Sequence, residues 1–391
     1  MSYKRIVILF FLFCFFYSLN AYGCRYTIRE IGFSDIGSLP YWLYIFTNSE
    51  TPEKDISSIN KLSRVFLDES NVKIKLVDVD KDTSSRAVDY LDNYNMKSFP
   101  SAVFVFPEGG TMSFSLNSPG RSFKESVWLL LEELVASSYR QSIKDELLKS
   151  YCVALVVEGI DKQANSKVFD EVKKAVSEIK MTFDQMPKEV NAPPAILVIP
   201  NHKAYDEEIL LRSLGINKKE TTKPSVSIIY GRGRIIGPVL QGEHITENKI
   251  YNLLAIVGAD CECGLDNSWV LGRMIPLRWD LSTQSALAEY LGFDVENPRV
   301  KSEMSQILSL NPAPDNPFDP MESGLKLGYS EGKIKVRRSS GNVSKISARE
   351  IHKSFHQTKS SNNLVLRRIL MGFGVILVLA IGVFLFIKCK R

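Results

Sequence analysis

Apolar and polar positions alternate in a regular order through the first third of the chain. Residues 41–46, YWLYIF, form a compact apolar run, which predicts a buried strand. Between residues 52 and 69 the apolar positions recur with the period of a helix, and residues 72–80, VKIKLVDVD, alternate strictly as a strand does. The pattern further predicts a helix, two short strands and a long closing amphipathic helix, over residues 84–96, 102–106, 111–116 and 122–139.

This order of elements, β-α-β-α-β-β-α, resembles the thioredoxin family over residues 36–138. The stretch 77–110, VDVDKDTSSRAVDYLDNYNMKSFPSAVFVFPEGG, contains the strand, helix, proline and strand of that family in sequence. The resemblance implies a central mixed sheet flanked by helices, and a cis-proline at Pro100 that lines a groove together with Phe99. We assign residues 24–140 to this first domain and interpret its N-terminal part, CRYTIREIGFSDIG, as an edge strand or a lead-in.

The chain departs from the family at the place of its Cys-x-x-Cys pair. Residues 47–54 read TNSETPEK, and no cysteine occurs between Cys24 and Cys152. In the family, a thiolate at this helix N-terminus is stabilised by the helix dipole and by unpaired N–H groups. We expect Ser49 and Thr51 to cap the helix here, but hydroxyl groups cannot exchange disulfides. The first domain is therefore predicted to keep the frame and to lack the redox centre.

A weaker copy of the same pattern follows over residues 149–260. The segment KPSVSIIYGRGR aligns with FPSAVFVFPEGG on a Pro-Ser pair, apolar β formers and a glycine turn, so Pro224 corresponds to Pro100. We therefore predict a second thioredoxin-like domain, with Pro224 as a second candidate cis-proline. Cys152 falls inside its first strand, where a buried, inert thiol is expected. The sequence GRGR at 231–234 does not precede a helix, which predicts a turn with exposed arginines instead of a phosphate cradle.

The best candidate for chemistry is the pair Cys261 and Cys263, which opens a segment, residues 261–310, that we interpret as a Cys-x-C segment and a helical cap. Three interpretations stay open: a structural disulfide, thiol-disulfide exchange by a strained bridge, and a soft-metal site for Cu(I) or Zn(II). A bridge could instead involve Cys24, and a zinc site would need further ligands from Cys24, His244 or a partner chain. The aromatic and arginine residues that follow fit a packed cap or a docking surface: Trp269, Arg273, Arg278 and Trp279.

Two apolar segments bear on the cellular compartment. Residues 1–23 have a basic start, an apolar run and small residues before Cys24, which predicts a cleaved signal peptide. Residues 369–387 carry no charge and predict a transmembrane helix, and a basic cytosolic tail, 388–391, follows it. We expect a single-pass membrane protein whose bulk is extracytoplasmic, and we favour a periplasm over an endoplasmic lumen. Lipidation of Cys24 is an alternative anchor.

The net charge of +5 is unevenly distributed along the chain. Residues 1–23 carry +2, residues 331–363 carry +6 and residues 364–391 carry +5, which leaves −8 on residues 24–330. An acidic body argues against nucleic acid as its ligand. The Pro- and Asp-rich residues after 310 and the basic, Ser-rich stretch beyond them predict a flexible stalk over 311–363.

These features predict an α/β protein with two thioredoxin-like domains, a stalk and one C-terminal membrane helix. Its expected role is binding, as an assembly or chaperone-like module that holds an extended peptide from an unknown protein partner in grooves at Phe99, Pro100 and Pro224. We expect no cofactor and assign no catalytic residue. The alternative function is thiol-disulfide exchange or soft-metal handling through Cys261 and Cys263.

Overall fold

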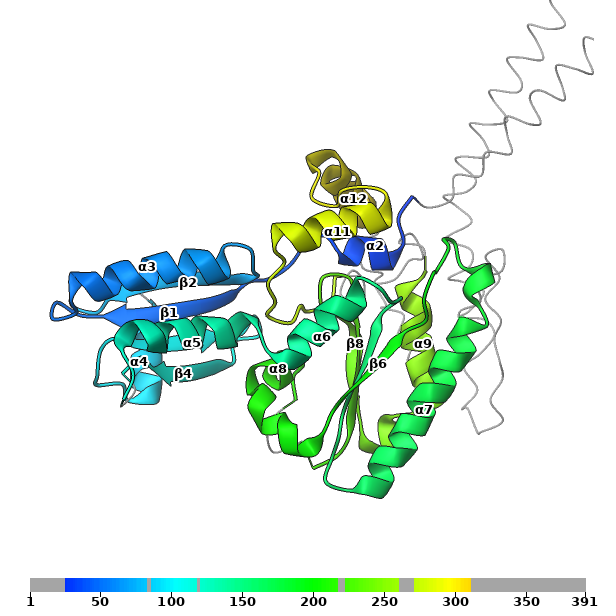
Figure 1. The fold of residues 1–391 in the computed structure, drawn as a ribbon, viewed down its shortest axis with the longest axis horizontal. Coiled ribbons are helices and arrows are strands. Elements are labelled where there is room, and N and C mark those ends of the chain that lie inside the picture. Colours follow the sequence, from blue (N-terminus) through cyan, green and yellow to red (C-terminus); the bar gives the residue numbers. More distant parts are fainter. Residues whose placement is uncertain (1–24, 83–85, 118–119, 217–221, 260–270, 311–391) are drawn as a thin grey trace, which may run out of the picture. The chain divides into compact units, whose positions relative to one another are not determined.

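The computed structural model describes residues 25–82, 86–117, 120–216, 222–259 and 271–310, which fold around two separate four-stranded sheets (Figure 1). The first domain contains the strands β1 (Tyr41–Thr47), β2 (Val72–Asp78), β3 (Ser101–Val105) and β4 (Thr111–Ser115). Its helices are α3 (Glu53–Leu67), α4 (Asp89–Tyr94) after the 3-10 turn η1 (Arg86–Val88), and α5 (Phe123–Val135).

The first sheet has the strand order β2-β1-β3-β4. Strand β1 pairs with β2 in parallel and with β3 antiparallel, and β3 pairs antiparallel with β4. A parallel pair joined through a helix, followed by a hairpin and a closing helix, is the topology that the sequence pattern predicts. The predicted mixed sheet of the first domain is therefore confirmed.

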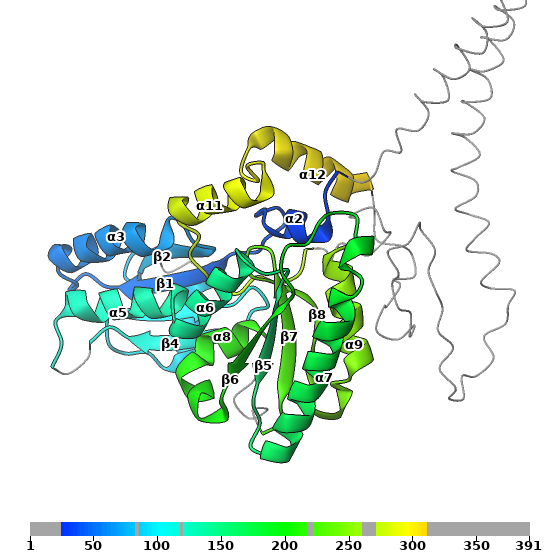
Figure 2. The ribbon, with the colours of Figure 1, turned by 45° about the vertical axis from the view of Figure 1, so that its right-hand side comes forward.

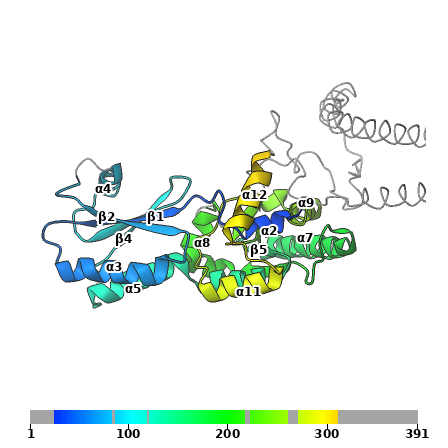
Figure 3. The same ribbon diagram turned by 90° about the horizontal axis from the view of Figure 1, so that it is seen from above.

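Strict alternation along β1 separates two cores on the two faces of this sheet. Tyr41, Leu43 and Ile45 point to the face that α3 and α5 cover, while Phe46 belongs to a smaller cluster on the face of α4. Figure 3 shows α3 and α5 on one side of the strands and α4 alone on the other. One face is thus covered by two long helices and the opposite face by one short helix.

The long helix predicted over residues 122–139 is two helices. Helix α5 ends at Val135, because Ala136 has extended backbone angles (φ −140°, ψ 145°). Ser137 then caps a new helix, α6 (Ser138–Leu147), by accepting a hydrogen bond from the amide of Arg140. A serine that can satisfy a free helix N–H group favours a new start at this point.

The second domain repeats the first with the strands β5 (Val153–Val157), β6 (Ala195–Ile199), β7 (Ser225–Tyr230) and β8 (Arg234–Gln241). The sheet order is β6-β5-β7-β8, with β5 parallel to β6 and antiparallel to β7, so order and directions match the first sheet. Figure 2 shows α7 (Lys162–Lys180) and α9 (Glu247–Val257) on one side of the sheet, and α6 and α8 (Glu208–Ser213) on the other. The predicted internal repeat is confirmed.

The stretch that precedes the first domain forms a short helix, α2 (Ile28–Gly32), and not an edge strand. A capping box between Thr27 and Glu30 begins this helix. Ile28 and Ile31 are fully buried in the core of the second domain, and the amide of Ile28 donates to the carbonyl of Ala259 at 3.0 Å. The residues before β1 therefore pack with the later domain, which no local pattern indicates.

The residues after 270 form an extended strap, 271–280, followed by α11 (Leu281–Leu291) and α12 (Pro298–Leu310). On the first domain, the hydroxyl of Tyr41 donates to Met274 O at 2.7 Å, and Asn71 Nδ2 donates to Ile275 O at 2.9 Å. On the second domain, Ile235 N donates to Arg273 O at 2.8 Å. The described part of this region therefore forms a packed cap, one of the two interpretations that the sequence leaves open, and Trp269 lies outside the described residues.

No helix within the described ranges is long and apolar enough to cross a membrane. The predicted signal peptide (1–23), stalk (311–363), transmembrane helix (369–387) and tail (388–391) lie outside the residues that the structure describes.

Candidate functional site

The turn after β1 stands where the thioredoxin family places its redox cysteines, and here it is closed by polar side chains. Thr51 Oγ1 donates to Asn48 Oδ1 at 2.9 Å and accepts from the amide of Asn48 at 3.0 Å. The hydroxyl and the amide of Ser49 both donate to Asp80 Oδ2, at 2.6 and 2.8 Å. Each hydroxyl of the turn is thus engaged in a local hydrogen bond.

The expectation that Ser49 and Thr51 cap the following helix is wrong. The N-cap of α3 is Pro52, with no side-chain cap hydrogen bond. Both hydroxyls instead donate to neighbouring side chains, Thr51 to Asn48 and Ser49 to Asp80. Asp80 comes from the loop after β2, thirty-one positions beyond Ser49 in the chain, so no local pattern predicts this contact.

The contact of Ser49 with Asp80 does not make a nucleophile. Hydrogen bonds from the Ser49 hydroxyl and amide hold the pKa of the Asp80 carboxyl below its usual value. A carboxylate with a lowered pKa is a poor general base, and a serine without a base is a poor nucleophile. The geometry of this turn therefore gives no support to covalent chemistry at Ser49.

Pro100 stands beside this turn, as the sequence predicts. The register pairs Phe46 with Ser101, so buried Pro100 follows directly beyond the last pair of β1 and β3. The Phe99–Pro100 bond is cis, and it is the only cis peptide bond among the residues described. The bond before Pro224 is therefore trans, which corrects the prediction for the second domain.

The two domains differ in whether a main-chain hydrogen bond joins the turn after the first strand to the residues before the proline. In the second domain, Ile160 N donates to Thr222 O at 3.0 Å, which joins the turn after β5 to the residues before Pro224. In the first domain, no hydrogen bond between described residues links 98–100 to the turn 48–51. Ser98 is exposed and Phe99 half-buried. The main-chain groups on the proline side of the first domain thus have no hydrogen-bond partner among the described residues, whereas those of the second domain are paired within the chain.

Gly159 makes the closure in the second domain possible. A Cβ atom built on it would lie 2.6 Å from Thr222 O and 2.7 Å from Pro224 N. We expect Gly159→Ala to lower the free energy of unfolding by about 1–3 kcal/mol, because backbone atoms cannot yield as side chains do. Gly110→Ala is the control, since its nearest neighbour would be 3.9 Å away. Urea unfolding compares the two, and equal effects would contradict the tight packing at Gly159.

Comparison with known proteins finds similarity only among solved structures. No protein-family model matches the chain, and no curated protein matches its sequence. Among solved structures, zinc-bound human ERp44 aligns with 59% of this chain and 57% of its own, at 12% identity and a TM-score of 0.21. The first two thioredoxin domains of Saccharomyces cerevisiae Eps1p align with 56% of this chain and 91% of theirs, at 13% identity and a TM-score of 0.19.

Full-length ERdj5 is similar over 55% of this chain and 29% of its own, at 12% identity and a TM-score of 0.20, so this chain spans less than two thirds of ERdj5 and of ERp44. The two domains have the thioredoxin-like fold. This assignment rests on the strand order and strand directions of the two sheets, which are the same in both.

The cysteines of the predicted chemistry are only partly described. Cys152 is a free thiol, fully buried in the core of the second domain, and burial raises its pKa far above the ordinary value. The expectation of an inert thiol is met. Cys24, Cys261 and Cys263 lie outside the described residues. Within the described ranges, no group of three or more His, Cys, Asp or Glu side chains could hold a metal ion.

The arginines of the GRGR segment are not exposed, contrary to the prediction. Arg234 is fully buried and donates to the carbonyl oxygens of Gly32, Ser34, Ile36 and Gly272, at 2.7–3.2 Å. The side chain of Arg232 is 14% exposed and pairs with Glu296 at 2.9 Å. Arg234 is buried because its guanidinium supplies the hydrogen-bond donors for the main-chain carbonyls around the end of α2. The segment is structural.

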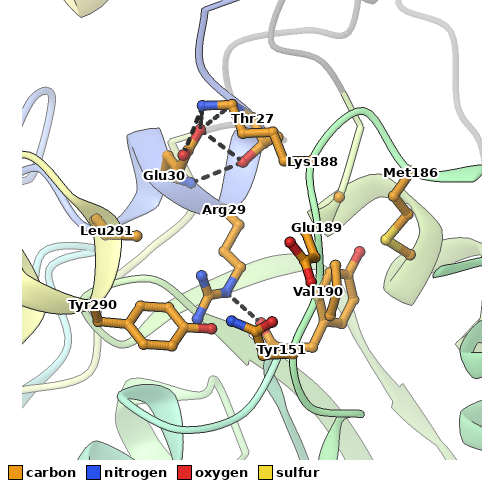
Figure 4. A pocket seen from close by; sticks show the side chains of 12 residues that line it. Thr27, Arg29, Glu30, Tyr151, Met186, Lys188, Glu189, Val190, Tyr290 and Leu291 are labelled. Carbon is orange, nitrogen blue, oxygen red and sulfur yellow. Dashed lines mark hydrogen bonds and ion pairs between the residues drawn. The ribbon is translucent and has the colours of Figure 1, made fainter. Parts of the chain in front are cut away.

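A cavity of about 190 Å³ lies where α2 meets the second domain (Figure 4). Arg29 donates to the carbonyls of Tyr151 and Ser150, at 2.8 and 3.1 Å. Lys188 contacts the Glu30 carboxylate at 2.7 Å. These charged side chains hold α2 in place, so the described contacts of the cavity explain a junction and assign it no ligand.

Proposed function

We propose that the chain is a binding protein whose thioredoxin-like domains recognise a partner without redox catalysis. The observation that carries this proposal is the turn 48–51, which has no thiol and whose hydroxyls are engaged by Asn48 and Asp80. The free main-chain groups of residues 98–100 beside it support a recognition site. The partner is an extended segment of another protein, held at Ser98 and Phe99 by main-chain pairing.

The contrast between the domains restricts this site to the first. In the second domain the chain itself occupies the corresponding position, because Ile160 N bonds Thr222 O. A peptide could pair there only by displacing that hydrogen bond. We therefore propose Phe99 and Pro100 as the groove and no longer include Pro224.

The setting of this binding function is also a proposal. The signal-like residues 1–23 and the uncharged stretch 369–387 support an exported head on a C-terminal membrane anchor. In that setting, a binding head near a membrane would act as an assembly or chaperone-like module for extracytoplasmic proteins. Lipidation of Cys24 stays an alternative mode of attachment.

Site-specific photocrosslinking in native membranes tests the proposed function. A photoreactive residue replaces Ser98 in one variant and Thr222, the equivalent position of the second domain, in the other. We expect a protein adduct from position 98 and little or none from position 222, because the latter is already paired within the chain. Adducts of similar yield at both positions, or at 222 alone, would refute the groove.

One described contact bears on the alternative function at Cys261 and Cys263. Because Ile28 N bonds Ala259 O, positions four residues from Cys24 and two residues from Cys261 lie side by side. This proximity permits a structural bridge that includes Cys24, and a structural bridge is the interpretation that we propose for these cysteines. We expect alkylation of these thiols only after reduction, at a potential below about −300 mV. Insulin reduction by the native protein, or stoichiometric copper or zinc, would instead support the alternative.

A further inference from the structure

Strand β2 is an outer edge of the first sheet. Within the part of the chain that the structure describes, β1 is its only partner strand. An edge strand leaves a row of main-chain N–H and C=O groups free to pair with another chain. The opposite edge strand, β4, differs because Arg212 donates to the carbonyl of Thr111 at 3.1 Å. Strand β2 is therefore a free edge of the first domain along Val72–Asp78, because the described part of the strap forms a β-bridge to this domain only at Ser70, before the strand begins.

The two faces of β2 carry different chemistry. Lys73 and Lys75 are exposed on the face of α4, and neither forms an ion pair with a described residue. Ile74 and Leu76 are half-buried on the other face, where they pack against the larger core. The strand thus presents two free cations on one side and two incompletely covered apolar side chains on the other.

On the same face of the sheet as the two lysines, the neighbouring strand β1 carries aromatic side chains. The register places Trp42 beside Lys73 and Tyr44 beside Lys75. The Trp42 and Tyr44 rings are stacked with centroids 6.0 Å apart, and Trp42 is 37% exposed. The short helix α4 covers only part of this face, as Figure 3 shows. Lys73 and Lys75 therefore lie beside a partly aromatic surface that α4 leaves accessible to solvent.

We propose that β2 binds, as an added strand, an extended segment of a partner protein in which acidic and apolar residues alternate. Side chains on one face of a strand repeat about every 6.6–6.8 Å, so carboxylates two residues apart match the spacing of Lys73 and Lys75. Opposite charges on neighbouring strands form favourable cross-strand pairs. The apolar residues of the added strand would cover Ile74 and Leu76.

The free edge selects a polypeptide over nucleic acid. Only a peptide backbone offers N–H and C=O groups at the spacing of a strand, and the body of the protein, residues 24–330, carries a net charge of −8. Lysines on an edge strand repel basic strands, and they disfavour pairing with neutral strands because the ammonium groups would lose water without gaining an opposite charge. A strand with carboxylates on that face escapes this repulsion, so the same lysines determine specificity.

This surface is separate from the groove at residues 98–100. Those residues precede β3, and β1 lies between β3 and β2 in the sheet. The two sites can therefore be distinguished experimentally, and either can exist without the other.

Fluorescence anisotropy with the full chain tests the proposal. The probe is a labelled peptide of alternating glutamate and valine, and the control peptide has the same composition with its glutamates grouped. We expect the alternating peptide to bind more tightly and its affinity to fall with salt. Lys73→Glu together with Lys75→Glu should weaken binding about tenfold or more. The matched control, Lys54→Glu with Lys61→Glu on exposed positions of α3, should change it less than about twofold.

A charge-swapped peptide of lysine and valine should bind the Lys73→Glu, Lys75→Glu variant, which also shows that this variant folds. Hydrogen exchange should show peptide-induced protection of the amides of β2. Equal affinity for the alternating and the grouped peptide would overturn the proposal, as would equal effects of the two double variants. Protection at residues 98–100 in place of β2 would overturn it as well, and would support the groove of the proposed function.

Discussion

Arg234→Met is expected to lower the free energy of unfolding of the second domain by about 3–5 kcal/mol. The guanidinium is fully buried and donates to four carbonyl oxygens, of Gly32, Ser34, Ile36 and Gly272. Methionine keeps much of the apolar stem and offers no donor, so these carbonyls would lose a partner within a closed environment. The substitution would weaken the contacts that join α2, β8 and the strap.

The contacts of Arg234 differ in kind from an ordinary ion pair. Burial lowers the pKa of its guanidinium, while Tyr230 and Asp35 oppose that shift. The charge is stabilised mainly by carbonyl dipoles, and these belong to segments about two hundred residues apart in the chain. Removal of one side chain therefore releases several segments together.

Arg232→Met is the matched control for this prediction. Arg232 lies two positions away and pairs with Glu296, and its guanidinium lies 5.8 Å from the centroid of the Trp279 ring. Glu296 keeps a second partner in Lys301, so we expect a smaller change of about 1–2 kcal/mol. Urea unfolding followed by far-UV circular dichroism compares the variants, and hydrogen exchange of β8 locates the loss. Similar effects of the two substitutions would show that the carbonyl contacts of Arg234 contribute little.

Local patterns predict the strands and helices of both domains because the apolar positions of an element repeat with the period at which its side chains reach the buried face. The alternation in VKIKLVDVD is the alternation of β2 between exposed lysines and half-buried apolar residues. The helical period over residues 52–69 marks Ile59, Leu62 and Phe66, which are buried in the core beneath α3. The break at Ala136 was missed since Leu134 and Val135 continue the apolar pattern up to the end of α5.

Contacts between distant segments could not be predicted in this way. The pairing of Ser49 with Asp80 and the burial of Arg234 depend on tertiary structure that brings donors to acceptors. The absence of a Cys-x-x-Cys pair is evident from the sequence, but no local pattern predicts that the proline groove of the first domain is open and that of the second domain is closed. That difference depends on Gly159, whose missing side chain allows Ile160 to reach Thr222.

Trp279→Ala is expected to lower the free energy of unfolding by about 3–5 kcal/mol, because it would leave a large cavity. Trp279 is 1% exposed, and its ring meets Phe33 edge to face with centroids 6.1 Å apart. Its indole N–H has no hydrogen-bond partner among the described residues. Trp279→Phe keeps most of the packing and removes this unsatisfied donor, so we expect a loss below about 1.5 kcal/mol.

The comparison of these two variants separates packing from hydrogen bonding in the strap. The main-chain bond from Trp279 N to Glu69 O, at 2.8 Å, is retained in both, so any difference between them arises from the side chain. Leu281→Ala is the control, because Leu281 is 70% exposed and should change the unfolding free energy by less than about 0.5 kcal/mol. Far-UV circular dichroism in urea measures all three. If phenylalanine proved as destabilising as alanine, a polar contact of the indole would be required. The strap would then be held by more than apolar packing at this residue.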